Sequence, residues 1–468
     1  MGRYKRLLSN TAILGAGTFA SKVLVFLLMP FYTSILSASE FGTADILSQT
    51  ANLLMPLAAV GICDGLFRFV LDADEENKKR ILSSATAVLG IGSIALVALI
   101  QILNLFSVFK GYVMLVAFYV IAANFHLAFA NFVRAEGKTT AFAIQGIANT
   151  VSTIVLNIVF LAVFDMGVLG YVLSVVLSDT IITIALIFSC KIYKNIDFRA
   201  VDKKLLGEML KFSVPYITTT VMWLVTSVSD RYIVTAFNGT EENGLYAAAY
   251  KIPTLISLAS GVFIEAWQLS SVKDALPEER SSFFGNVYKN YMSIMFMGAS
   301  FVIASAQIFT RLLLADSYFI SWQYVPILVI ATVFSALSAF MGSVYFLEKK
   351  SLLSMLTAMS GAVINVVINL ILIPKHGAMG AAVATFISYL AVYTIRALDT
   401  SNYVKFKLHL PRVIINTGVL FAQSIVMLEG IRYWRYMQIA ALTFLLIFNG
   451  KGIVRGILQI FSKKFKKI

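Results

Sequence analysis

The sequence predicts an all-α integral membrane protein with about 14 transmembrane helices, built as two homologous six-helix lobes plus two C-terminal helices, with both termini cytoplasmic. Of the 468 residues, 59% are hydrophobic and only 13% are charged, and the mean hydropathy is +0.83. Soluble domains average about 45–50% apolar and about 25% charged residues. Because so little polar surface is available, the composition excludes a water-soluble enzyme, a disordered chain and a secreted disulfide scaffold.

Apolar runs bounded by charged residues or by Gly, Pro and Asn define the expected helices, since a bilayer crossing needs about 20 residues. The first lobe comprises 11–36, 42–70, 82–107, 112–133, 140–164 and 167–190. The second lobe comprises 210–237, 244–271, 284–314, 322–346, 352–373 and 378–398, and the added helices are 409–428 and 434–457. The first run is too long for a signal peptide, so we expect it to be retained as a span.

Basic residues alternate along the connections between these helices. Most of the 38 Lys and Arg residues fall on the two tails and the even-numbered connections. The odd-numbered connections carry only Lys110, Arg311, Lys375, Arg432 and Arg435. Basic residues concentrate on the cytoplasmic side of membrane proteins. The alternation therefore predicts cytoplasmic termini, and it accounts for the net charge of +14 without a nucleic-acid partner.

The two halves of the chain carry related motifs. Glu136 and Asn157 are 21 residues apart, and the same spacing recurs between Glu348 and Asn369. This repeat predicts an N-terminal lobe at 1–193, a cytoplasmic linker at 194–209, a C-terminal lobe at 210–400, and two added helices with a basic tail at 401–468. An even number of helices per lobe makes the repeats parallel, and transporters with such repeats bind substrate between them.

No residue pattern indicates covalent chemistry or a bound cofactor. The stretch from Glu136 to Thr139 ends like a phosphate-binding loop, but Phe132 stands where the first glycine is needed, and no strand precedes it. The three histidines are too dispersed in the sequence to form a metal cluster. We therefore expect a protein that is not an enzyme and has no cofactor.

Ionisable side chains within apolar spans are the strongest indication of a functional site, because each is costly in the bilayer and usually faces a cavity or a partner. They are Lys22, Asp64, Arg68, Asp179, Asp230, Arg231, Lys251 and Glu265. The basic members Lys22, Lys251, Arg68 and Arg231 are candidate contacts for an anionic substrate. Asp64 and Arg68 are four residues apart, so they have the alternative of neutralising each other on one helix face.

A second group consists of oxygen-bearing side chains. Asn365 and Asn369 share one helix face, Thr385 lies in the next span, and Asp230 supplies a carboxylate. Hard cations prefer such oxygens, and transporters place coupling ions at mid-membrane clusters. The alternative is that these residues bond helices to one another.

Several short motifs together resemble a known family. They are Phe41-Gly42, Arg134-Ala-Glu-Gly-Lys138, Ser229-Asp-Arg231, Gly244-Leu-Tyr246 with Ala249-Tyr-Lys251, and Gly377-Ala-Met-Gly-Ala-Ala-Val-Ala-Thr385. In their order and spacing, from about residue 10 to 400, the chain resembles the polysaccharide and oligosaccharide lipid flippases. Their superfamily also contains lipid II flippases and multidrug and toxic compound extrusion proteins.

The resemblance implies two six-helix lobes around a cavity that opens alternately to each face, and a polyprenyl-pyrophosphate substrate that carries sugars. Lys22 and Lys251 look like cavity arginines of lipid II flippases. The set Asp230, Asn365, Asn369 and Thr385 is similar to a sodium site in those relatives, except that Asn369 stands where they have an acid.

We therefore expect an alternating-access flippase in the inner (plasma) membrane that moves a lipid-linked oligosaccharide from the cytoplasmic to the outer face. Its partners would be this substrate, membrane lipids and polysaccharide polymerases or transferases, with sodium or a proton as coupling cation. A lipid II flippase is the alternative. A multidrug exporter is disfavoured by the basic residues, and a membrane glycosyltransferase by the short outward connections.

Overall fold

All regular structure in the described part of the chain is helical, which confirms the predicted all-α class. The computed structural model describes residues 26–465, apart from 72, 274–279 and 349. Lys22 therefore lies outside the described residues. The chain divides into two compact units, Met1–Val228 with Gly239–Gly244, and Ser229–Asn238 with Leu245–Ile468. The predicted lobe and linker boundaries stay predictions.

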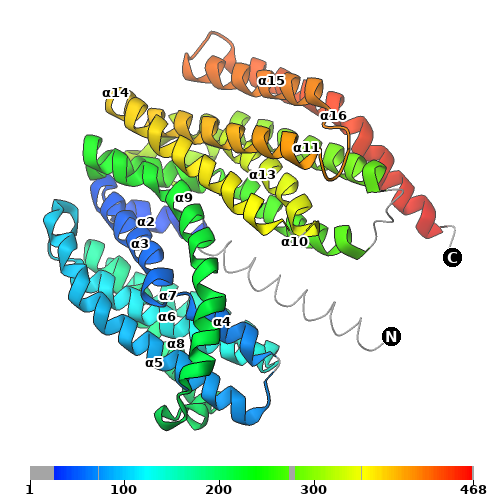
Figure 1. The fold of residues 1–468 in the computed structure, drawn as a ribbon. Coiled ribbons are helices and arrows are strands. Elements are labelled where there is room, and N and C mark those ends of the chain that lie inside the picture. Colours follow the sequence, from blue (N-terminus) through cyan, green and yellow to red (C-terminus); the bar gives the residue numbers. More distant parts are fainter. Residues whose placement is uncertain (1–25, 72, 274–279, 349, 466–468) are drawn as a thin grey trace. The chain divides into compact units, whose positions relative to one another are not determined.

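The first unit contains the helices drawn in blue to green in Figure 1. They are α2 (Met29–Ile35), α3 (Ala38–Ala58), α4 (Ile62–Val70), α5 (Glu75–Leu99), α6 (Val113–Ala135), α7 (Thr139–Asn157), α8 (Gly167–Ser189) and the first part of α9 (Lys203–Lys251). Short 3₁₀ segments connect them at η1 (Ile100–Leu105), η2 (Ser107–Phe109), η4 (Ile192–Asn195) and η5 (Phe198–Ala200), and α7 continues into a π-helical turn, η3 (Ile158–Val163).

Local sequence explains why the predicted span 42–70 is two helices. Ser37 begins α3 with a capping box, in which its N–H donates to the Glu40 carboxylate at 2.9 Å. Pro56 lies within α3, and the chain then passes through Val60 and Gly61 with φ of 48° and 63°. This break sets α3 and α4 at an angle of 55°.

The second unit begins within α9 and runs to the C-terminus. Its other helices are α10 (Thr254–Lys273), α11 (Arg280–Ala304), α12 (Ala306–Leu313), α13 (Val325–Leu347), α14 (Ser351–Thr400), α15 (Leu410–Leu428) and α16 (Trp434–Phe465), with a 3₁₀ segment η6 (Asp316–Gln323). The last two, α15 and α16, pack as a pair and are orange and red in Figure 1.

Two glycines reverse the chain inside long helical stretches. Gly239 in α9 has φ of 90°, and Gly377 in α14 has φ of 54° and ψ of −140°. Glycine adopts such angles without a steric penalty. Accordingly, α9 covers the predicted span 210–237 and the start of the next span, while α14 covers both 352–373 and 378–398.

The helices have the length and surface of membrane spans. In the described ranges, seven helices are long and apolar enough to cross a bilayer, or up to ten if each bent pair is one span. On α5, Ile91, Ile94 and Leu99 are 70%, 74% and 72% exposed. Water would disfavour such large exposed apolar side chains, whereas lipid accommodates them. The chain is therefore a multi-pass membrane protein, while the count of fourteen and the side of the termini stay predictions.

Each unit has its own apolar core. In the first unit, residues of α4, α5, α6 and α8 form it. In the second unit the core lies between α10, α11 and α13, where Trp267 stacks on Phe340 with ring centroids 5.2 Å apart. The Trp267 Nε1–H donates to Ser343 Oγ at 2.9 Å, which satisfies its polar group.

The segment after α8 is held on the N-terminal end of α5. The Asp197 N–H donates to Ser83 Oγ at 2.8 Å, and Lys79 Nζ lies 3.1 Å from Asp197 Oδ2. The hydrogen bonds from Lys79 and from the Arg199 N–H lower the pKa of the Asp197 carboxyl below its ordinary value. The predicted linker 194–209 therefore starts with a fixed contact to α5.

Candidate functional site

The buried carboxylate of Asp230 is bound by both parts of α9. In a straight helix, residues 16 positions apart would be about 24 Å apart. Because the chain reverses at Gly239, the Tyr246 hydroxyl instead donates to Asp230 Oδ2 at 2.6 Å. The Arg231 backbone N–H donates to Oδ1 at 2.9 Å, and Asp230 is only 1% exposed.

Two asparagines of α14 continue the polar group next to Asp230. Asn365 Oδ1 accepts hydrogen bonds from Ser229 Oγ at 2.7 Å and from Asn369 Nδ2 at 2.9 Å. Asn365 Nδ2 donates to Ser388 Oγ at 3.5 Å, and Ser388 Oγ donates to the Thr385 carbonyl at 2.9 Å. The structure thus joins Asn365 directly to Asn369 and through Ser388 to Thr385, while Ser229, the residue preceding Asp230, connects them to α9.

One oxygen of this group, Asn369 Oδ1, has no hydrogen-bond partner among the described residues, and Asn369 is 0% exposed. The Thr385 hydroxyl lies on a residue that is 2% exposed, and it interacts with the Tyr246 hydroxyl. Leaving a buried acceptor unpaired costs about 1–3 kcal/mol. A cation bound by these oxygens and by the Asp230 carboxylate would remove that cost, because hard cations take carboxylate, amide and hydroxyl oxygens. The four residues have the side-chain types that ligate hard cations, and the cation site itself stays a prediction.

The basic candidates lie in different environments. Arg231 is 5% exposed and places its guanidinium carbon 5.2 Å from the centre of the Tyr250 ring, a cation–π contact. Lys251, the last residue of α9, is half-buried, and its carbonyl accepts a hydrogen bond from Thr254 Oγ1. Arg68 is exposed in α4. Of these cations, Lys251 combines partial burial with accessible surface.

Sequence reasoning missed three members of the Asp230 group, namely Ser229, Tyr246 and Ser388. Ser229 and Ser388 lie within four residues of predicted ligands and so could have been found from helical spacing. Tyr246 could not, since its contact with Asp230 depends on the reversal at Gly239.

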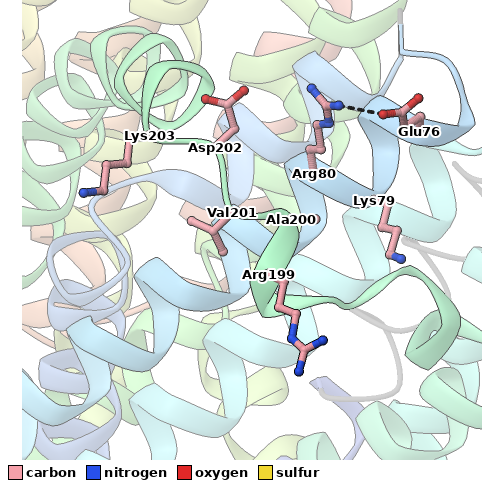
Figure 2. A pocket seen from close by; sticks show the side chains of 8 residues that line it. All are labelled: Glu76, Lys79, Arg80, Arg199, Ala200, Val201, Asp202 and Lys203. Carbon is pink, nitrogen blue, oxygen red and sulfur yellow. Dashed lines mark hydrogen bonds and ion pairs between the residues drawn. The ribbon is translucent and has the colours of Figure 1, made fainter.

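The first unit has an open groove of about 510 Å³ where α5 begins. It is lined by Glu76, Lys79, Arg80, Arg199, Ala200, Val201, Asp202 and Lys203 (Figure 2). Arg80 points to Glu76 and pairs with it at 2.6 Å, while Lys79 pairs with Asp197. Two of its four cations are therefore engaged by neighbouring acids, and the groove does not concentrate positive charge on one point.

The fold is shared with solved transporter structures. A structure of the lipid II flippase MurJ in an inward closed conformation matches 95% of this chain and 99% of that chain, with 14% identity and a TM-score of 0.71. An outward-facing and an inward-facing structure of a multidrug resistance MATE family transporter of the MOP superfamily each match with a TM-score of 0.58. Their identities are 14% and 15%, and each match covers 84% of this chain and 95% of the other. These similarities show a common fold.

The sequence itself matches a family model described as "Polysaccharide biosynthesis protein" over residues 7–267. This range is more than half of the 468 residues. Among curated proteins, none is similar enough in sequence to count as a match. The matched range includes the whole first unit that the structure describes, together with Asp230, Arg231 and Lys251 of the second. The chain therefore shares its fold with the MurJ and MATE structures and belongs to the polysaccharide biosynthesis protein family.

Proposed function

We propose that this protein is a flippase that moves a polyprenyl-pyrophosphate-linked oligosaccharide from the cytoplasmic to the outer face of the inner membrane by alternating access. One observation carries the proposal: a chain of the polysaccharide biosynthesis protein family shares its fold over 95% of its length with a lipid II flippase. The protein's task is binding and exposure on the opposite side, with no bond made or broken.

The physical difficulty of this transport is the charged head group. Moving an unpaired pyrophosphate through a low-dielectric region is strongly unfavourable. A lysine offsets part of that cost as a point charge, although it lacks the bidentate geometry that arginine offers to phosphate. Lys251 supports such a role because it is half-buried, and Lys22 is proposed from its sequence position alone.

Transport into liposomes tests the proposal. The purified protein is reconstituted with a fluorescent polyprenyl-pyrophosphate oligosaccharide, and its movement between leaflets is measured with a membrane-impermeant quencher. Lys251→Ala should slow movement at least tenfold, and Lys251→Arg should retain part of it. Lys375→Ala, at an exposed lysine of α14, is the matched control and should behave as the unaltered protein. Equal rates for Lys251→Ala and Lys375→Ala would refute the role of Lys251.

A lipid II flippase is the second candidate, and the similarity to MurJ favours it. It differs in substrate and not in mechanism. Presenting both lipids in the same liposome assay separates the two functions: faster movement of lipid II than of the oligosaccharide lipid would assign the chain to lipid II transport.

We propose further that a monovalent cation, sodium or a proton, binds at Asp230, Asn365, Asn369 and Thr385 and biases the conformational equilibrium. The unpaired side-chain oxygen of Asn369 and the buried carboxylate of Asp230 support it. A ligand shifts such an equilibrium only by its different affinities for the two states. Binding to this site must therefore differ between inward-open and outward-open forms.

Thermal unfolding in sodium, potassium and choline chloride at constant ionic strength and pH tests the cation. Sodium should raise Tm of the unaltered protein, and Asp230→Asn should abolish that rise. Asp399→Asn is a matched control, because Asp399 Oδ2 likewise accepts a hydrogen bond from a tyrosine, Tyr345, at 2.7 Å. If sodium, potassium and choline act equally on the unaltered protein, the sodium site is absent and a proton is the better assignment.

A further inference from the structure

A histidine and an aspartate meet in the middle of the first unit. His126 is near the centre of α6, Asp179 is near the centre of α8, and the two helices pack along their lengths. His126 Nδ1 lies 3.0 Å from Asp179 Oδ1, and the two side chains are 15% and 9% exposed. In the sequence these residues are 53 positions apart, so only the fold brings them together.

Side chains of α7 fix the geometry of this pair. The Gln145 side-chain oxygen lies 2.7 Å from His126 Nε2, and Asn149 Nδ2 donates to Asp179 Oδ1 at 2.8 Å. Ser178 Oγ donates to Asn149 Oδ1 at 2.5 Å, which orients the amide so that its NH₂ group faces the aspartate. The pair is thus held by three helices.

The hydrogen bonds determine which protonation state this geometry suits. Both ring nitrogens of His126 face an oxygen acceptor, Asp179 on one side and Gln145 on the other. A neutral imidazole has only one N–H, so it can satisfy only one of two acceptors. A ring with a proton on each nitrogen satisfies both, and it makes the pair electrically neutral.

Loss of one proton would leave the pair with a net charge of minus one in a region that disfavours unpaired charge. No bond other than the N–H bond changes in this step, because the imidazolium gives its proton to water and the ring nitrogen keeps the electron pair. Protonation of the pair is therefore coupled to how much water and compensating charge its surroundings provide.

Other titratable groups of the same unit lie near the pair. Tyr119 of α6 is close enough to Asp179 to interact electrostatically with it, and Tyr171 of α8 is close to Tyr119. Helix α3 packs on both α6 and α8. Its residue Asp45 interacts electrostatically with Tyr171. The side chains that α7 directs at the pair, Gln145 and Asn149, are neutral amides.

A groove of about 260 Å³ lies between α6 and α8 and is lined mainly by apolar residues, with Thr180 and Thr183 as hydroxyl groups in its wall. Neither His126 nor Asp179 lines this groove. Thr183 lies one helical turn beyond Asp179, and its hydroxyl has no hydrogen-bond partner among the described residues.

We propose that His126 and Asp179 form a proton-binding site in the first unit, separate from the cation site around Asp230, and that its protonation is linked to the transport cycle. The linkage rests on the proposed flippase function, whereas the site itself does not. Two experiments separate these claims.

The first experiment observes the site without any substrate. The sequence contains three histidines, so the variant His376→Gln/His409→Gln leaves His126 as the only one. Histidine-selective ¹⁵N labelling and solid-state NMR in liposomes then report the state of its ring directly. We expect both ring nitrogens protonated at pH 8, where an exposed imidazole is neutral. A ring with one protonated nitrogen from pH 6 to 8 would overturn the proposal and leave the pair as a contact between helices.

The second experiment measures lipid movement in the same liposomes with and without an imposed pH gradient. The gradient should change the rate at least threefold for the unaltered protein and leave the rate of Asp179→Asn unchanged. Asp399→Asn serves as the control in the other unit and should respond as the unaltered protein does. If lipid moves but no gradient alters its rate, the linkage is wrong and the flippase function stands. If the NMR result holds and no lipid moves under any condition, the flippase function is wrong and the site stands.

Discussion

The close approach of two glycines in the first unit makes a stringent test of the structure. Gly42 lies in α3 and Gly244 lies just after the break of α9. The Asn243 side-chain amide donates to the Gly42 carbonyl at 3.0 Å, and the Ser39 and Thr240 hydroxyls are 2.7 Å apart. These bonds hold the two backbones together along a stretch where only hydrogen atoms separate them.

A methyl group at either glycine would not fit. A Cβ on Gly42 would lie 2.7 Å from the Gly244 nitrogen and closer still to the Thr240 carbonyl oxygen. A Cβ on Gly42 would lie 1.9 Å from the Thr240 oxygen, whereas ordinary contacts begin near 3.4 Å, so the backbones must separate by about 1.5 Å. Overpacking of this kind costs about 1–3 kcal/mol. We therefore expect Gly42→Ala and Gly244→Ala each to lower the free energy of unfolding by about that amount.

Thermal unfolding of the purified variants in one detergent measures this effect. Gly90→Ala in α5 is the matched control, since a Cβ there would meet no atom within 4 Å, and it should be neutral or stabilising by up to about 1 kcal/mol because alanine favours the helix. The double variant Gly42→Ala/Gly244→Ala should cost less than the two single changes combined, because the first separation already makes room for the second methyl. A Tm for Gly42→Ala equal to that of Gly90→Ala would refute the reasoning.

Three further predictions concern charged groups. Arg396 is 2% exposed and donates to Thr357 Oγ1 at 3.0 Å and to the carbonyls of Ser338 and Ser354 at 3.0 and 3.3 Å. Arg396→Met should lower the free energy of unfolding by about 1–3 kcal/mol, measured by thermal unfolding. An unchanged Tm would show that these hydrogen bonds only offset the cost of burying the guanidinium. The pKa of Asp197 is lowered, chiefly by Lys79, so its contribution to stability is present above the ordinary carboxyl pKa near 4 and is lost as pH falls through the folded value. Lys79→Met should therefore speed amide exchange of the segment after α8 at pH 7, and equal exchange rates would contradict this. Burial, with the nearby cations Lys289, Arg412 and Lys407, lowers the pKa of His409. The neutral imidazole therefore contributes its full stabilisation above about pH 6.5, and this contribution is lost as pH falls through the pKa of His409 in the folded protein. His409→Gln should flatten the dependence of Tm on pH in this window, and an unchanged slope would refute the reasoning.

The sequence by itself determined the class of fold and the helix face that Asn365 and Asn369 share. Composition and hydropathy require a membrane protein because there is too little polar surface for water, and that inference needs no tertiary contact. Helical spacing was enough to place Asn365 and Asn369 on one face, since residues four apart are neighbours on any helix. Their hydrogen bond at 2.9 Å bears this out. Hydropathy and helical spacing were therefore sufficient to predict that these elements are helices.

Only the tertiary structure decided which distant groups touch. Tyr246 contacts Asp230 because Gly239 adopts a positive φ. The hydrophobic periodicity of the sequence does not predict that backbone angle. His126 and Asp179 are 53 positions apart in the sequence, yet the packing of α6 against α8 brings their side chains to 3.0 Å. The physical reason is the same in both cases. Local sequence sets the direction of a side chain on its own helix, whereas its partner is set by where the chain reverses and which helices pack together.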